Sequence, residues 1–190
     1  MIRGTIRTLL FVCCLCAVPM SSTAQEVVHA LVGTVSVIDA TAKTITVKTE
    51  DGSEGLFKDS TGSKIAIDFN KDLRAQTTAA DAFTKTGTKV IVYYFGDSDV
   101  RTAVSLQNLG TGPFTRSSGT VVKLDRHKHL LTIKSGSGAN ETFQIGPKTI
   151  AETSSGAVEG EQFEPRKGDQ VRVTASPDGA GQTALFINAS

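Results

Sequence analysis

The chain has 190 residues, of which 39% are hydrophobic, 21% charged and only 6% aromatic, and its formal net charge is +1. This composition is typical of a globular protein and excludes a disordered chain or a bundle of membrane helices. A net charge this close to zero also argues against a nucleic-acid-binding protein, which normally carries a basic face.

Residues 1–24 have the pattern of a secretory signal peptide. Arg3 and Arg7 precede the apolar run LLFVCCLCAV, and small residues lead to Ala24, after which we expect cleavage. The run is shorter than the roughly 20 apolar residues of a transmembrane helix, so we expect no membrane span after cleavage. All three cysteines and both methionines lie in this segment. The mature chain would have 18 basic and 19 acidic residues, and it would lack the ligands for disulfides, thiolate chemistry and soft Cu(I) sites.

The rest of the chain contains an internal repeat. GTVSVIDATAKTITVKTEDG at 33–52 matches GTVVKLDRHKHLLTIKSGSG at 119–138, and KTGTKVIVYY from Lys85 matches RKGDQVRVTA from Arg166. Because both ends of the units align in the same order, we expect two copies of one small domain. The predicted boundaries are 25–107 for the first copy, 108–118 for a linker rich in Gly, Pro and Ser, and 119–190 for the second copy.

Each unit reads as a set of short β-strands. Apolar and polar residues alternate at 45–48 and 90–94, and at the equivalent 131–134 and 171–175. In the first strand, however, the shared apolar residues Val35 and Ile38 are three positions apart, as are Val121 and Leu124 in the second unit. A bulge or strong bend is needed to turn both inward, and a bent first strand is what a small barrel requires.

The sequence therefore predicts an all-β protein made of two tandem, small OB-like β-barrels, each with at most one short helix. In the first unit this helix is expected at Lys71–Phe83, where the composition is rich in alanine. In the second unit only a short turn is expected in its place.

The pattern G-T-V-x-x-ϕ-D, T-ϕ-T-ϕ-K and K-x-G-x-x-V-x-V, where ϕ is aliphatic, resembles a family of bacterial secreted domains of unknown function. The resemblance covers both units and implies the barrel fold and a periplasmic or secreted location, without implying an activity. The opening hairpin is also similar to that of periplasmic copper and silver chaperones with an OB barrel. Those proteins hold the ion with Met, His and Trp, and the mature chain departs from them because it has no Met or Trp.

Asp125, His127 and His129 form the stretch that most resembles a metal site. In an extended hairpin arm, residues two apart share a face, so both imidazoles and the carboxylate could reach one Zn²⁺ or Cu²⁺ ion. The other interpretation is an exposed turn, because Thr41 and Lys43 occupy the positions of the two histidines in the first unit. For Asp39 and Asp125 we favour the role of starting the turn by bonding nearby backbone.

Two acidic groups allow a chemical reading as well. Asp97 and Asp99 lie in a turn that could attract Ca²⁺, and Glu159, Glu161 and Glu164 could supply an acid–base pair. We favour a polar hairpin turn for the two aspartates and exposed loop acids for the three glutamates. The chain has no nucleophile elbow, phosphate loop or dinucleotide fingerprint, so we predict no enzyme, no catalytic or metal-binding residue and no cofactor.

The fourth strand of the first unit carries an extra apolar face. Alternation turns Tyr94 inward and turns Ile91, Tyr93 and Phe95 outward, whereas the second unit has polar residues at the three outward positions. We expect this face to pack on the other barrel, on the segment 71–83, or on an envelope protein or polymer.

Together these features predict an exported, non-enzymatic binding or scaffolding module of the bacterial cell envelope, with no nucleic-acid partner. The alternative is a periplasmic protein that binds a divalent metal ion through Asp125, His127 and His129. An enzyme is the third possibility.

Overall fold

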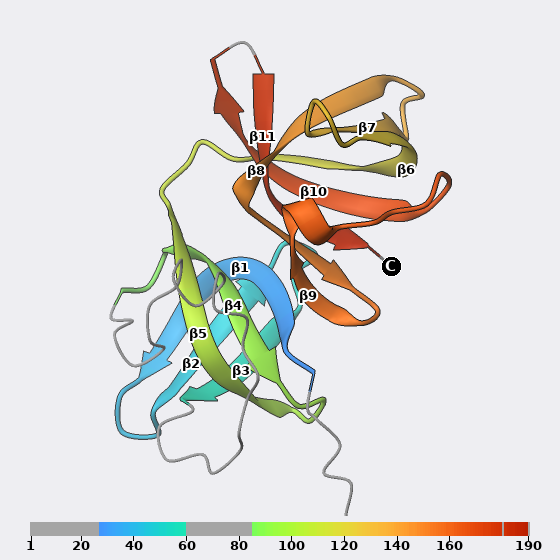
Figure 1. The fold of residues 1–190 in the computed structure, drawn as a ribbon. Helices are drawn as coiled ribbons and strands as arrows, with labels where there is room; N and C mark the ends of the chain where they lie inside the picture. The colour runs from blue at the N-terminus through green and yellow to red at the C-terminus, as the bar shows by residue number, and fades with distance from the viewer. Residues whose placement is uncertain (1–26, 60–84, 180, 190) are drawn as a thin grey trace, which may run out of the picture.

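The computed structural model describes residues 27–59, 85–179 and 181–189, and within them the chain forms two β-barrels that lie against each other (Figure 1). The first barrel consists of β1 (His29–Asp39), β2 (Thr44–Thr49), β3 (Glu54–Asp59), β4 (Lys89–Phe95) and β5 (Val100–Gly110). The second consists of β6 (Thr115–Asp125), β7 (Leu130–Ser135), β8 (Asn140–Thr153), β9 (Gly156–Glu159), β10 (Gln170–Asp178) and β11 (Gly181–Ala189), with the 3₁₀ turn η2 (Gly160–Gln162).

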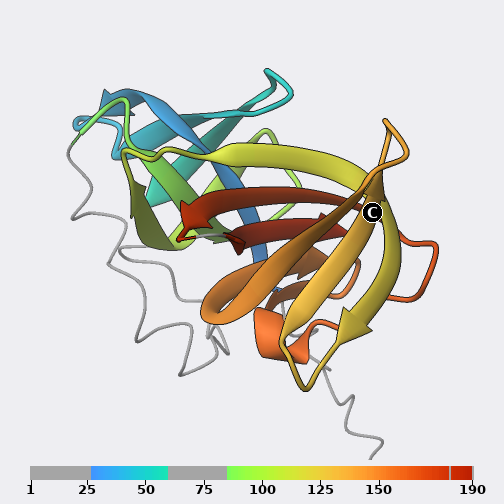
Figure 2. The same ribbon diagram turned by 90° about the horizontal axis from the view of Figure 1, so that it is seen from above.

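Both barrels have the same strand order. The first closes in the order β1-β2-β3-β5-β4, with β3 and β5 parallel and every other pair antiparallel. The second repeats this as β6-β7-β8-β11-β10, closed by the parallel pair β8–β11, and β9 extends β8 as an extra hairpin strand. Seen from above, the first barrel (blue to green) again lies beside the second (yellow to red) (Figure 2). The predicted fold class, two tandem OB-like barrels, is confirmed.

The predicted bend of the first strand is a β-bulge in both barrels. The pairing of β1 with β2 shifts register between Val35 and Val37, and the pairing of β6 with β7 shifts between Val121 and Lys123. These are equivalent positions of the repeat. The extra residue turns the apolar side chains on both sides of the bulge toward the core, which explains their spacing of three in the sequence.

The shared K-x-G motif closes each barrel against this bulge. Gly87 has a φ of 80°, and its N–H donates to the carbonyl oxygen of Val35 at 2.8 Å; Gly168 has a φ of 101° and donates to Val121 at 2.9 Å. Positive φ is accessible to glycine at little cost, so the motif keeps glycine at this turn.

Two apolar cores fill the barrels, and a third apolar cluster joins them. Its members are Ala30, Ile91 and Tyr93 from the first barrel and Ile150 and Phe186 from the second. Ile91 and Tyr93 are fully buried and Phe95 is 4% exposed, while Tyr94 packs against the first core as predicted. Of the three expected coverings for the apolar face of β4, the structure favours the second barrel. A partner would reach Ile91 and Tyr93 only if the barrels separated.

The connection between the barrels is shorter than predicted. Strand β5 continues to Gly110 and β6 begins at Thr115, so most of the predicted linker 108–118 is strand and only 111–114 lies between strands. The helix predicted at Lys71–Phe83 lies outside the described residues. Within the described ranges, no helix is long and apolar enough to cross a membrane.

Candidate functional site

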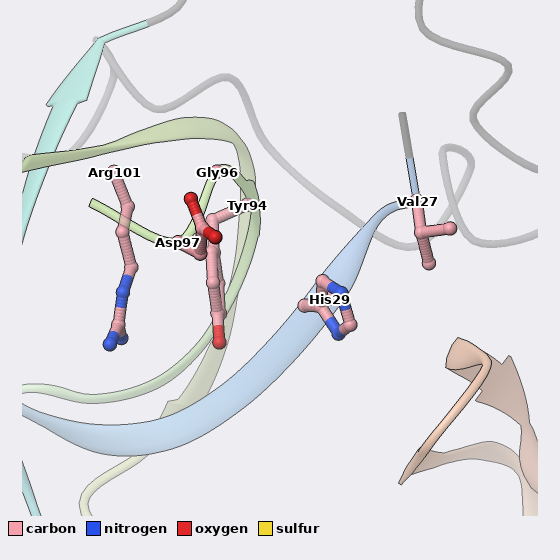
Figure 3. Close-up of a pocket in the computed structure, with 6 residues that line it drawn as sticks. All are labelled: Val27, His29, Tyr94, Gly96, Asp97 and Arg101. Atoms are coloured by element: carbon pink, nitrogen blue, oxygen red, sulfur yellow. The ribbon is translucent and has the colours of Figure 1, made fainter. Parts of the chain in front are cut away.

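A cleft of about 460 Å³ opens at one end of the first barrel (Figure 3). It lies where β1 begins, β4 ends and β5 begins, and the turn between β4 and β5 borders it. The residues that line it are Val27, His29, Tyr94, Gly96, Asp97 and Arg101. Most of these side chains are polar, so the barrel ends in hydrogen-bonding groups rather than in apolar ones.

Sheet register brings the three largest groups of this cleft together. His29 pairs with Tyr94 across β1 and β4, and Arg101 pairs with Phe57 across β5 and β3. The Arg101 guanidinium lies 5.1 Å from the centroid of the Tyr94 ring, and the Tyr94 and His29 rings are 5.9 Å apart. Arg101, Tyr94 and His29 therefore form a row, in which the guanidinium and the phenol hydroxyl point the same way (Figure 3).

Aromatic rings hold Arg101 in this row. Its guanidinium also lies 5.9 Å from the Phe57 ring, which meets Tyr94 edge-on at 5.3 Å. Cation–π contacts of this kind orient a guanidinium without using its N–H donors. Among the described residues, Arg101 has no carboxylate partner. Burial raises the pKa of Tyr94, so its hydroxyl is a neutral hydrogen-bond donor at neutral pH.

His29 belongs both to the cleft and to the contact between the barrels. Its Nδ1 lies 2.6 Å from Oε1 of Glu152 on β8, and the other oxygen of that carboxylate accepts from the backbone N–H of Ala30 at 2.7 Å. The pKa of Glu152 is raised, because the effect of burial outweighs the lowering effect of the hydrogen bonds from His29 and Ala30. When Glu152 is ionised it can only accept, so Nδ1 carries the proton and Nε2 is left for another partner.

The second barrel provides an internal comparison for this end of the fold. Thr115, Ala175 and Gln182 occupy the positions of His29, Tyr94 and Arg101. There Oγ1 of Thr115 donates to Oε1 of Gln182 at 2.7 Å, which closes the barrel with a neutral pair. The fold thus closes without a guanidinium, a phenol or an imidazole, and stability of the barrel does not explain these groups in the first copy.

The histidines proposed as metal ligands lie in a turn and not on an extended arm. Residues 126–129 form the turn between β6 and β7, and His129 has a φ of 53°, as does Lys43 at the equivalent place. Oδ1 of Asp125 accepts from the backbone N–H of Lys128 at 3.1 Å, which confirms its predicted role in starting the turn. The expectation that Asp125, His127 and His129 share a face is wrong, because two residues of a tight turn do not alternate like those of a strand. In the described part of the chain, no three His, Cys, Asp or Glu residues are grouped to hold a metal ion.

The structure brings that turn beside the acidic stretch of the second barrel. Arg126 Nη2 lies 3.0 Å from Oε1 of Glu164, and Arg126, His129 and Glu161 line a small hollow of about 210 Å³. The Arg126 and Glu164 side chains are 52% and 77% exposed, so their ion pair contributes little stability. Glu161 and Glu164 therefore lie on the surface beside an arginine, as the prediction of exposed acids requires. For Glu159 that prediction is wrong, because this residue is the last of strand β9 and is half-buried.

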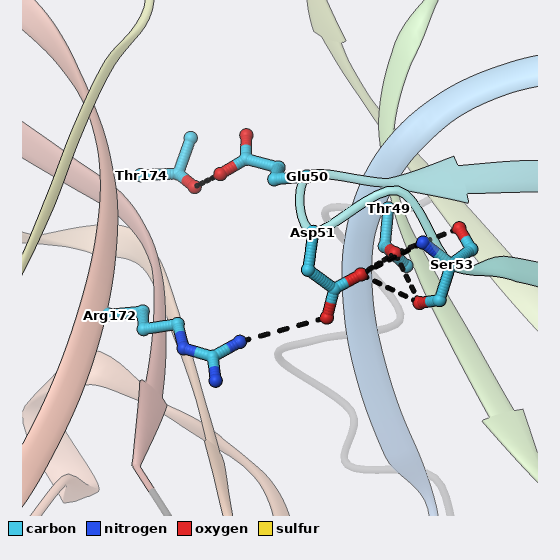
Figure 4. Close-up of polar contacts among 6 residues, drawn as sticks. All are labelled: Thr49, Glu50, Asp51, Ser53, Arg172 and Thr174. Atoms are coloured by element: carbon cyan, nitrogen blue, oxygen red, sulfur yellow. Dashed lines mark hydrogen bonds and ion pairs between the residues drawn. The ribbon is translucent and has the colours of Figure 1, made fainter.

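A second polar cluster joins the barrels at the turn between β2 and β3 (Figure 4). Glu50 forms ion pairs with Lys89 and with Arg116 and accepts from the Thr174 hydroxyl at 3.3 Å. Beside it, Asp51 lies 3.7 Å from Arg172.

Within its own turn, Asp51 accepts hydrogen bonds from Thr49 and Ser53, which hold its pKa well below the usual range. Glu50 and Asp51 correspond to Gly136 and Ser137 in the second unit. The first barrel alone therefore carries this acidic contact.

The sequence alone did not indicate the cleft. From the sequence, His29 is expected to be solvated near the mature N-terminus, Arg101 belongs to no motif, and Asp97 is expected as an acid of a polar turn. The expectation for His29 is wrong, because the residue is half-buried and its Nδ1 lies 2.6 Å from Glu152. The residues are far apart along the chain and become neighbours through strand pairing. A comparison of the two units could have indicated it, because Tyr94 corresponds to Ala175 in the repeat and Arg101 corresponds to Gln182.

A comparison with solved structures matches less than half of the chain to CusF. A crystal structure of Ag(I)CusF has a TM-score of 0.33 and 19% sequence identity, and the match covers 41% of this chain and 99% of that one. CusF-Ag(I), residues 10–88 from Escherichia coli, has a TM-score of 0.32 and 19% identity over 42% of this chain and 94% of that one. A Cu(II) form of a CusF variant gives 0.31 and 20%, over 40% and 91%. No protein-family model matches the chain, and no curated protein matches it in sequence.

Proposed function

We propose that the protein is an exported, non-enzymatic binding module of the cell envelope, whose first barrel binds a ligand in the cleft at His29, Tyr94 and Arg101. The second barrel supports this site. Export is proposed from the signal-peptide pattern of residues 1–24, which directs a chain out of the cytoplasm.

The observation that carries the proposal is the difference between the two copies of the fold. The same barrel end is closed by a neutral Thr115–Gln182 hydrogen bond in one copy and carries a guanidinium, a phenol and an imidazole in the other. Arg101 is partly exposed, has no ion-pair partner among the described residues and is held in place by aromatic rings, so its donors are oriented before any ligand arrives. Preorganisation of this kind increases affinity because less side-chain entropy is lost on binding.

The volume and lining of the cleft also fit a ligand site. Pockets for small ligands are typically about 300–1,000 Å³ and contain a few convergent polar groups. OB barrels use the loop between their fourth and fifth strands for recognition, and here that loop supplies Gly96 and Asp97.

The experiment exchanges the cleft for the corresponding end of the second barrel. The full chain is produced with His29→Thr, Tyr94→Ala and Arg101→Gln, and the processed protein is immobilised beside the wild type. Both are then incubated with envelope extract, and the retained proteins and polymers are identified by mass spectrometry. Circular dichroism and thermal melting check that the variant keeps the barrel fold.

We expect the wild type to retain material that the cleft variant does not. The matched control is Arg126→Gln, which removes an exposed arginine of the second barrel and should retain the same material as the wild type. If the wild type and the cleft variant retain the same material, or if neither retains any, the cleft is not the binding site.

A further inference from the structure

The chemistry of the cleft indicates which ligand it can take. Arg101, Tyr94 and His29 present three different polar ends in one row, with neighbouring groups 5.1 and 5.9 Å apart. Arg101 contributes only donors, Tyr94 a hydroxyl and His29 its second ring nitrogen. Asp97, exposed at the edge of the cleft, contributes only acceptors (Figure 3). A ligand that satisfies all four must carry both an anionic oxygen group and several hydroxyls.

The charge around the cleft favours a single negative charge on the part of the ligand that enters it. Arg101 attracts an anion, but the carboxylates of Asp97, on the cleft wall, and Glu152, behind His29, oppose a second negative charge. The planar guanidinium fork matches a carboxylate, to which it can donate two parallel hydrogen bonds. A carboxylate therefore suits this site better than a phosphate dianion does.

The size and the apolar part of the lining favour a ring-sized ligand over a free ion. A cleft of about 460 Å³ is much larger than an isolated carboxylate needs. Val27, whose surface is 46% exposed, adds an apolar contact beside the polar row. A sugar ring offers C–H surface to such a side chain and hydroxyls to the groups around it.

We infer that the cleft binds an acidic saccharide: Arg101 pairs with the carboxylate of the sugar, Tyr94 and His29 bond its ring or hydroxyl oxygens, and Asp97 accepts from a hydroxyl. This inference rests on the proposed function, because it names the ligand class of the same site. In this arrangement Arg101 attracts the carboxylate of the sugar, and Asp97 and Glu152 repel a second negative charge.

The test uses a pair of probes, a sugar acid and its methyl ester, of which only the acid carries a charge. Trigalacturonate and its methyl ester are titrated into the full, processed protein, and inorganic phosphate is added as a competitor, with binding followed by NMR chemical shifts and calorimetry. We expect the acid to bind, the ester to bind at least about tenfold more weakly and phosphate not to displace the acid. High salt should weaken binding of the acid, since part of the cleft is open to solvent.

Variants assign the effect to Arg101. Loss of a charge-assisted hydrogen bond predicts a roughly ten- to hundredfold weaker affinity for trigalacturonate in Arg101→Gln. Arg101→Lys should lie between this variant and the wild type, because it keeps the charge and loses the fork. Lys134→Gln removes one exposed positive charge from the second barrel and should bind like the wild type.

The outcomes separate the ligand class from the function. Equal binding of acid and ester, displacement by phosphate, or equal affinity of Arg101→Gln and the wild type overturns the inference. No binding of trigalacturonate, together with cleft-dependent retention of envelope material, overturns the inference and leaves the proposed function intact. If no envelope material is retained in a cleft-dependent way and trigalacturonate does not bind either, both the inference and the proposed function are refuted.

Discussion

Replacement of Ile150 by alanine tests whether the contact between the barrels stabilises the protein. Ile150 belongs to the second barrel, is fully buried and packs in the cluster that contains Ile91 and Tyr93 of the first. The change removes three carbon atoms, worth about 2.4 kcal/mol at about 0.8 kcal/mol for each buried methylene. The cavity left behind adds to this, so we expect a loss of about 2–5 kcal/mol in the free energy of unfolding.

The loss is measured by urea unfolding followed by circular dichroism, and it corresponds to a fall of about 4–20 °C in melting temperature. Val37→Ala is the matched control, since it also truncates a β-branched side chain but at a position that is 55% exposed. That control should stay within about 0.5 kcal/mol of the wild type. If Ile150→Ala is as mild as Val37→Ala, the apolar contact between the barrels does not stabilise the fold.

Three further substitutions test separate parts of the structure. Burial raises the pKa of Glu152 above its ordinary value of 4.5, so the folded protein binds a proton there more readily than the unfolded chain. The wild type should therefore gain stability relative to Glu152→Gln as the pH falls through the raised pKa toward 4.5. A difference in urea midpoint between the two proteins that is constant with pH would contradict this. Gly119→Ala should lower the free energy of unfolding by about 1–3 kcal/mol, because its Cβ would collide with a backbone carbonyl of β7. Gly136→Ala is the control, since there is open space around Gly136, and it should change the free energy of unfolding by less than about 0.5 kcal/mol. Equal urea midpoints for the two variants would refute the collision. Tyr93→Phe removes a buried hydrogen bond to Gln107 at 3.0 Å and should cost about 1–3 kcal/mol in the same assay, and a neutral effect would show that this bond is not needed.

The fold could be predicted from the sequence because its constraints repeat. The bulge of the first strand followed from apolar residues three apart, and the same spacing occurs again 86 positions later in the chain. The extra apolar face of β4 followed from alternation, which assigned Ile91 and Tyr93 to the outside of the barrel. Alternation does not predict what covers that face, because the packing of two domains depends on the match between two distant surfaces, which a pattern within one strand does not describe.

The candidate site was harder to predict, for two physical reasons. Its residues come from three strands, and strand register decides that His29 lies opposite Tyr94 and Arg101 opposite Phe57. The extended arm assumed for Asp125, His127 and His129 is wrong for a local reason, since Asp125 starts a tight turn there. The left-handed backbone of His129 is matched by Lys43, so the turn belongs to the barrel and needs no imidazole.

Because the chain carries the same barrel twice, one copy can form the candidate site while the other supports it. The outer face of β4 in the first barrel is covered by the second barrel. Tyr94, near the C-terminal end of the same strand, lines the cleft. Glu152 connects the two regions, because it orients the His29 ring from the second barrel. The second barrel therefore helps to shape the candidate site, although all the residues that line the cleft belong to the first barrel, so docking of the barrels is part of the geometry of the cleft.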